Sequence, residues 1–143
     1  MEVRLEHANL TVRDVEATIR FLTTAFPEFR MRGEGTNRDG TRWAHVGTHD
    51  TYIALNQAKA DSERDRMPYR GEPGLNHLAY EVDDVDSLRL RLKAAGYRDS
   101  TVPNAHPHRK RVYFYDPDGN DWEFVQYFSQ DPAERNDYAL PDS

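Results

Sequence analysis

Two stretches of the chain, GLNHLAYEVDDVDSL at 74–88 and RLEHANLTVRDVEAT at 4–18, share one pattern. In each stretch, an alternating segment carries one histidine and is followed by an Asp-Val pair. Alternation predicts a strand with one buried face, and an aspartate before an apolar periodic segment is a typical helix N-cap. Both stretches therefore predict a strand followed by a helix, with His7 and His77 at equivalent places.

The two stretches also keep a constant offset of 70 residues. Asp14 and Asp84 obey this offset, and much further along the chain Trp43 and Tyr113 obey it as well. A common offset that extends over a strand, a cap, a helix and a later strand indicates an internal duplication. We therefore predict two related modules in which Trp43 and Tyr113 are equivalent positions.

Each half predicts the same order of elements, βαβββ. The turn signals NRDG at 37–40 and DPDG at 116–119 separate later strands, because glycine tolerates a positive φ and proline fixes its own φ. The predicted helices lie at about 15–26 and 85–95, and the predicted later strands lie at about 29–34, 41–47, 52–56, 97–102, 111–115 and 121–127.

These elements predict an α+β fold class, in which two tandem βαβββ modules form a curved mixed sheet around a metal-binding cup. The helices are expected to cover one face, which leaves the face bearing His7 and His77 to line the cup. The length suits a single domain over residues 1–143. We expect module one at about 1–56, a linker at about 57–74, module two at about 75–128 and a polar tail at 129–143.

Composition excludes several classes of function. The formal net charge of −6 disfavours nonspecific binding to nucleic acid or to an anionic membrane, and the basic stretch HPHRKR at 106–111 is expected to be a solvated loop. The chain has no cysteine, which excludes disulfides, thiol nucleophiles and thiolate metal ligands. No segment is long and apolar enough for a membrane span or a secretion signal, so a cytoplasmic protein is expected.

A carboxylate stands out on the last predicted strand, where Glu123 lies between two aromatic residues. Alignment of the two halves places Ala54 at the corresponding position of the first module. Taken alone, Glu123 could equally be an edge-strand surface residue or the ion-pair partner of an arginine. Taken with His7 and His77, it completes two imidazoles and one carboxylate, an arrangement that holds a metal and leaves coordination positions open.

The segments LEHANL, GLNHLAY and YDPDGNDWEF resemble those of the vicinal oxygen chelate superfamily. That superfamily includes glyoxalase I, fosfomycin-resistance thiol transferases, bleomycin-binding proteins and extradiol ring-cleaving dioxygenases. The resemblance extends over essentially the whole chain.

The resemblance implies that His7, His77 and Glu123 are metal ligands. Glyoxalase I has a fourth protein ligand where this chain has Ala54, so a lactoylglutathione lyase is disfavoured. Bleomycin-binding relatives generally lack the metal-binding residues, so they are disfavoured as well.

The strongest local similarity is to type I extradiol dioxygenases. The segment at 104–123 is similar to their pattern of His, Tyr and metal-binding Glu, which implies substrate contacts for His106 and Tyr113. THDTYIAL is similar to their HDT segment and implies an acid–base role for His49. Asn9, two residues after the first ligand on the same strand face, is implied to bind substrate.

Two assignments in the basic loop remain open. Either His106 or His108 could reach the site, and Arg109 or Lys110 could attract a substrate carboxylate. We assign Arg109 as the expected substrate-binding residue.

Three hypotheses of function follow. The first is an extradiol-type dioxygenase that binds a small substrate through vicinal oxygens. The second is another metal-dependent enzyme, either a glyoxalase-like lyase or isomerase or a fosfomycin-type thiol transferase. The third is a non-catalytic protein that binds or sequesters a small molecule, such as a resistance protein. The expected cofactor is a divalent metal, Fe(II) or Mn(II) first and Zn or Ni next, and the resemblance implies a homodimer.

Overall fold

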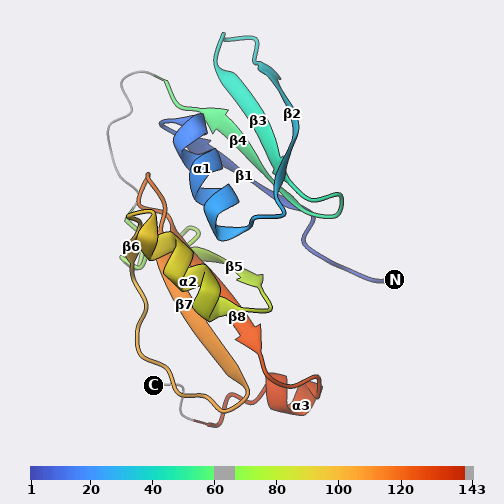
Figure 1. The fold of residues 1–143 in the computed structure, drawn as a ribbon. Helices are drawn as coiled ribbons and strands as arrows, with labels where there is room; N and C mark the ends of the chain where they lie inside the picture. Colours follow the sequence, from blue (N-terminus) through green and yellow to red (C-terminus); the bar gives the residue numbers. More distant parts are fainter. Residues whose placement is uncertain (60–66, 141–143) are drawn as a thin grey trace. The chain divides into compact units, whose positions relative to one another are not determined.

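The computed structural model describes residues 1–59 and 67–140. The chain divides into two compact units, Met1–Asp65 and Arg66–Ser143, and each is described by itself (Figure 1). Across the described ranges, no helix is long and apolar enough to cross a membrane.

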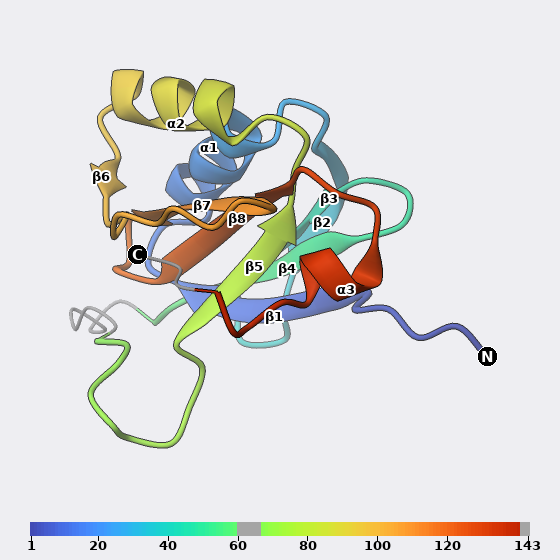
Figure 2. The same cartoon turned by 90° about the horizontal axis from the view of Figure 1, so that it is seen from below.

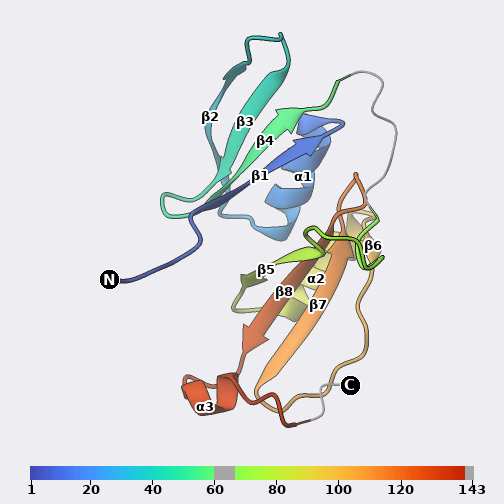
Figure 3. The same cartoon turned by 180° about the vertical axis from the view of Figure 1, so that it is seen from behind.

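The described part of the first unit contains a four-stranded mixed sheet and a helix. The strand order is β1-β4-β3-β2, with β1 parallel to β4 and the other pairs antiparallel. Helix α1 covers one face of this sheet, and Figure 3 shows the opposite face. The elements are β1 (His7–Val12), α1 (Val15–Ala25), β2 (Arg30–Thr36), β3 (Arg42–Gly47) and β4 (Tyr52–Gln57).

The second unit repeats this plan in its described residues. Its strand order is β5-β8-β7-β6, again with the first pair parallel and the others antiparallel. Helix α2 lies over the face formed by β7 and β8 (Figure 2). The elements are β5 (His77–Glu81), α2 (Val85–Ala94), β6 (Arg98–Asp99), β7 (Arg109–Tyr115), β8 (Asp121–Tyr127) and α3 (Pro132–Arg135).

The α+β class and the tandem βαβββ order are therefore confirmed. Two details differ: β6 is shorter than the predicted strand at 97–102, and α3 was not predicted. A capping signal for α3 is present in the sequence, because the Asp131 side chain accepts a hydrogen bond from the Ala133 backbone and Pro132 occupies the first turn. The arrangement of the two sheets around one cup, within one domain, stays a prediction.

Both helices start where the repeated aspartates predict. The Asp14 carboxylate accepts a hydrogen bond from the Ala17 backbone at 3.2 Å, and the Asp84 carboxylate accepts one from the Ser87 backbone at 2.9 Å. These caps satisfy amide groups that the first helical turn leaves without partners. Gly96 ends α2 with a φ of 88°, a left-handed conformation that glycine adopts at little cost.

The hairpin between β7 and β8 is organised by the buried carboxylate of Asp116. It accepts hydrogen bonds from the backbone of Asp118 at 2.9 Å, from the backbone and side chain of Asn120 at 3.0 and 2.9 Å, and from Trp122 Nε1 at 3.0 Å. The predicted DPDG turn therefore also holds the indole next to Glu123. In this way the hairpin fixes the register of the strand that carries the candidate metal ligand.

The strand registers correct one predicted equivalence. Glu123 pairs with Tyr113, whereas Ala54 pairs with His45. The structural counterpart of Tyr113 is therefore His45 and not Trp43. The offset of 70 residues holds for the first strand and helix, but the later strands of the first module do not keep it.

The core of the second unit generates a paired test on helix α2. Leu92 is fully buried, whereas Leu90 on the same helix is 69% exposed. Leu92→Ala should lower the free energy of unfolding by about 2–5 kcal/mol, because the lost apolar contacts leave a cavity. Leu90→Ala should change it by less than about 0.5 kcal/mol. Denaturant unfolding monitored by circular dichroism measures both, and equal effects would contradict this assignment of the core.

Candidate metal and substrate site

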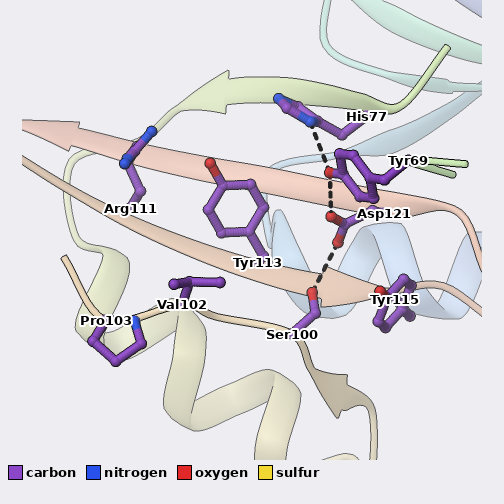
Figure 4. A pocket seen from close by; sticks show the side chains of 9 residues that line it. All are labelled: Tyr69, His77, Ser100, Val102, Pro103, Arg111, Tyr113, Tyr115 and Asp121. Atoms are coloured by element: carbon purple, nitrogen blue, oxygen red, sulfur yellow. Dashed lines mark hydrogen bonds between the residues drawn. The ribbon is translucent and has the colours of Figure 1, made fainter. Parts of the chain in front are cut away.

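A cavity of about 530 Å³ opens on the face of the second sheet that α2 does not cover. Arg111 lies at one end and Ser100 with Tyr115 at the other, with Tyr113 between them (Figure 4). Residues from β5, β6–β7 and β8 contribute to its walls, together with one residue from the segment before β5. The lining residues are Tyr69, His77, Ser100, Val102, Pro103, Arg111, Tyr113, Tyr115 and Asp121.

Two of the three predicted metal ligands meet at this cavity. His77 Nε2 lies 2.9 Å from Glu123 Oε2. The strands β5 and β8 are neighbours, and the partner of Glu123 in the ladder is Ala79, whose small side chain leaves room for the contact. The Glu123 side chain is only 12% exposed. A carboxylate at that depth requires a positive or hydrogen-bonding partner, and His77 occupies that place.

The other nitrogen of His77 is held by a chain of hydrogen bonds. Tyr69 Oη lies 2.9 Å from His77 Nδ1 and donates to Asp121 Oδ2 at 2.5 Å. Ser100 Oγ donates to the second oxygen of Asp121 at 2.8 Å (Figure 4). Burial, followed by the hydrogen bond to Asp121, raises the pKa of Tyr69. The phenol is therefore protonated at neutral pH.

Tyr113 lies beside the His77–Glu123 pair. It is opposite Glu123 in the ladder, and its ring meets the His77 ring edge-on at a centroid distance of 5.7 Å. Burial, with the nearby Glu123 charge second, raises the pKa of Tyr113 to about 12. A neutral phenol in the cavity can donate a hydrogen bond to a substrate oxygen.

The third predicted ligand, His7, lies on β1 of the first unit. Its Nδ1 is 2.7 Å from Glu6 Oε1, and its ring stacks on Tyr52 with centroids 4.7 Å apart and an angle of 11°. The hydrogen bond to His7 is the main reason why the pKa of Glu6 is lowered. In both histidines Nδ1 is therefore engaged by an oxygen group, which is how proteins commonly orient a metal-binding imidazole.

Ala54 is buried on the same sheet face as His7 and carries no donor atom. Its ladder partners are Asn9 on β1 and His45 on β3. The Oδ1 of Asn9 accepts a hydrogen bond from Asn56 Nδ2 at 2.8 Å. The substrate-binding role expected for Asn9 stays a prediction.

The complete ligand set also stays a prediction. Within residues 1–59 and 67–140, no group of three or more His, Asp or Glu side chains forms a ready-made metal cluster. The second unit contributes a pair, His77 and Glu123, and His7 belongs to the unit that is described separately.

The expected acid–base residue, His49, is exposed in the turn between β3 and β4. That turn is closed by the Thr48 and Thr51 backbones, with a hydrogen bond of 2.8 Å. The turn belongs to the first unit, whereas the cavity belongs to the second. Its role stays a prediction.

His106 does not line the cavity. It is 5% exposed, its Nε2 lies 3.0 Å from the Asp137 carbonyl, and its Nδ1 accepts a hydrogen bond from the His108 backbone at 3.1 Å. Both ring nitrogens are thus used within the fold. His108 lies 3.9 Å from Glu134, so both histidines contact the segment that follows β8.

Arg109 is likewise covered by the C-terminal segment. Its guanidinium donates to the Arg135 carbonyl at 3.0 Å and lies over the Tyr138 ring at 5.3 Å. Lys110 points to the other face of β7, where it pairs with Asp86 at 2.6 Å. The arginine that lines the cavity is Arg111, two residues further along the strand. The basic stretch is thus partly buried, and not the solvated loop that was expected.

Sequence reasoning missed Arg111, Asp121 and Tyr69. A signal existed for the first two, because they precede Tyr113 and Glu123 by two residues and so share their strand faces. No comparable signal existed for Tyr69, which comes from the polar segment before β5 and has no regular periodicity.

The family model for the Glyoxalase/Bleomycin resistance protein/Dioxygenase superfamily matches residues 4–124, which include both histidines and Glu123. The chain belongs to this superfamily. The match starts before β1 and ends within β8, so it covers nearly all of both βαβββ modules.

Solved structures of this superfamily have the same fold. A glyoxylase/bleomycin resistance protein/dioxygenase domain from Frankia sp. EAN1pec is 25% identical, with a TM-score of 0.74 over 89% of this chain and 99% of that one. The fosfomycin resistance protein FosX from Mesorhizobium loti is 24% identical, with a TM-score of 0.65 over 94% and 98%.

A mutant of FosX from Listeria monocytogenes, complexed with Mn(II) and 1S,2S-dihydroxypropylphosphonic acid, is 20% identical, with a TM-score of 0.67 over 96% and 100%. At identities below 25%, the two FosX structures show a shared fold.

The turn between β3 and β4 provides a second test. A Cβ on Gly47 would lie 2.2 Å from the Thr51 carbonyl, whereas a Cβ on Gly33 would lie 3.7 Å from the Trp43 ring. Gly47→Ala should therefore cost more than about 1 kcal/mol of stability, because the backbone would have to move, and Gly33→Ala should cost less. Urea unfolding of both variants checks this. A Gly47→Ala protein as stable as the Gly33→Ala protein would contradict the geometry of the turn.

Proposed function

We propose that this protein is a metal-dependent enzyme that acts on a small anionic substrate with neighbouring oxygen atoms. One divalent cation is held by His7, His77 and Glu123. The observation that carries the proposal is the His77–Glu123 pair, a partly exposed imidazole 2.9 Å from a nearly buried carboxylate, beside a cavity of about 530 Å³. Such a pair supplies two of the three ligands of a facial site of two histidines and one carboxylate.

The donor set fits a divalent transition metal. Imidazole nitrogen with carboxylate oxygen suits Fe(II) and Mn(II), and the absence of cysteine removes the thiolate ligands that favour softer sites. The FosX complex from Listeria monocytogenes, which shares this fold, contains Mn(II). A bound cation would act as a Lewis acid on substrate oxygens. Ala54 adds no ligand, which keeps coordination positions available.

The residues of the second unit supply substrate binding. Arg111 at one end of the cavity attracts an anionic group through charge and paired hydrogen bonds. The neutral phenol of Tyr113 donates a hydrogen bond to a substrate oxygen close to the metal. Val102 and Pro103 add apolar surface to the cavity lining, which suits a short carbon chain.

The reaction favoured by this arrangement is the fosfomycin type, in which water or a thiol opens a strained ring of a phosphonate substrate. The ligand of the Listeria FosX complex combines a phosphonate with two adjacent hydroxyl groups. A cavity with Arg111 at one end and a metal-binding pair further along fits the same combination of an anion and vicinal oxygens.

Extradiol ring cleavage is the second candidate. The ladder pairing of Tyr113 with Glu123 favours it, since the same two residues belong to the dioxygenase-like segment at 104–123. In that reaction Fe(II) would be the cofactor and His49 the proposed acid–base group. A binding or resistance protein without catalysis is the remaining alternative.

Metal binding tests the core of the proposal. Wild-type protein prepared without chelators should bind about one Mn(II) per chain. His7→Ala, His77→Ala and Glu123→Gln should each weaken binding by about a hundredfold or more, because each removes one of only three protein ligands. Mn(II) titration followed by electron paramagnetic resonance measures the free ion. His108→Ala is the control and should bind as wild type; full affinity in any of the three variants removes that residue from the site.

The anion-binding role of Arg111 has its own test. Loss of a charge-assisted contact should raise KM for fosfomycin by about tenfold in Arg111→Gln, with a smaller change in kcat. Lys110→Gln, on the opposite strand face, is the matched control. Consumption of fosfomycin by Mn(II)-loaded protein, with water or a small thiol, gives the rates. Oxygen uptake with catechols and Fe(II), in the absence of fosfomycin turnover, would instead favour ring cleavage.

A further inference from the structure

We propose that Tyr69 is a positioning residue that fixes His77 with its proton on Nδ1, so that Nε2 is the nitrogen offered to the metal. This inference rests on the proposed metal site and adds a residue from outside the repeated βαβββ elements, on the segment that precedes β5. Its partners, Asp121 and Ser100, complete a relay that runs along one side of the cavity (Figure 4).

The direction of the hydrogen bonds follows from counting protons. A phenol has a single hydrogen, and an ionised carboxylate only accepts. Tyr69 donates to Asp121 Oδ2 at 2.5 Å, so its oxygen must accept from His77 Nδ1 at 2.9 Å. His77 therefore carries a proton on Nδ1, and Nε2, which lies 2.9 Å from Glu123 Oε2, is the nitrogen on the side of the other candidate ligand.

The backbone at Tyr69 supports a specific role. Among the described residues, Tyr69 is the one non-glycine residue with a positive φ, at 67°. This conformation is unfavourable for a side chain with a Cβ and persists where other interactions hold it. Burial of the residue as a whole does not explain this backbone conformation, because Tyr69 is 51% exposed. Two hydrogen bonds hold it instead. The Tyr69 backbone donates to Oδ1 of Asn76, the residue before His77, at 3.0 Å, and the Tyr69 hydroxyl donates to Asp121.

The two modules orient their histidines by different means. His7 Nδ1 contacts the adjacent Glu6, and the residue that pairs with His7 in the ladder is Tyr52. The residue that pairs with His77 is Asp121, and the Tyr69 hydroxyl links its carboxylate to His77 Nδ1. The second module therefore depends on a segment that lies outside the repeated strands and helix.

Tyr69→Phe tests the relay with little change in shape. Without the hydroxyl, the His77 ring loses its fixed orientation, and Mn(II) affinity should fall by about tenfold or more. Tyr115→Phe is the matched control, because Tyr115 lines the same cavity and its ring packs against Arg98. Asp121→Asn, which removes the acceptor charge, should shift affinity in the same direction.

A second readout separates positioning from general packing. In Zn(II)-loaded protein, long-range proton–nitrogen NMR should show His77 protonated on Nδ1 and metal-bound through Nε2 in the wild type. Tyr69→Phe should weaken or lose this single state, while Tyr115→Phe retains it.

Each outcome decides the inference. If the wild type binds no Mn(II), the proposed function fails. If the wild type binds it and both Tyr69→Phe and Asp121→Asn match its affinity and its His77 spectrum, the relay is overturned and the metal site stands. If circular dichroism shows Tyr69→Phe to be unfolded, Asp121→Asn decides alone.

Discussion

The buried carboxylate of Glu123 is the constraint on which the site depends. A charged group at this depth is costly unless a cation or strong donors compensate it. The fold brings His77 to within 2.9 Å on the neighbouring strand, and Tyr113 lies opposite on the other side. The hairpin held by Asp116 and the small Ala79 next to Glu123 both serve this arrangement, because they set the register and leave the space in which the pair meets.

The duplication explains how a symmetrical plan gives an asymmetric site. At the positions that the ladders make equivalent, the first module has Ala54 and His45 where the second has Glu123 and Tyr113. Both modules retain a histidine at the start of the first strand. The cavity and Glu123, the proposed acidic ligand, lie in the second module, so the proposal assigns substrate binding mainly to that half.

Most of the fold could be predicted from the sequence, because its signals are local. Asp14 and Asp84 cap helices, Gly96 takes a left-handed conformation and DPDG forms the turn before Glu123, each through interactions within a few residues. That His77 and Glu123 share one site was expected from the resemblance to the vicinal oxygen chelate superfamily, whereas the parallel pairing of β5 with β8 that brings them together was not predicted.

The remaining features depend on long-range packing that periodicity does not encode. Arg109 has the strand face expected for a substrate ligand, but the segment at 128–140 covers it, and Arg111 lines the cavity instead. His106 is used by the same segment. Tyr69 reaches His77 only because an irregular segment adopts a strained backbone. The equivalence of Trp43 and Tyr113 was wrong because the loops of the first module shift its later strands.

The most direct measurement of the central claim is a crystal structure of the Mn(II)-loaded protein with anomalous scattering to locate the ion. We expect one Mn(II) bound by Glu123 and by the Nε2 atoms of His77 and His7, with Tyr69 still in contact with His77 Nδ1. An ion bound elsewhere, or a chain that remains free of metal with Glu123 and His77 paired as before, would contradict it.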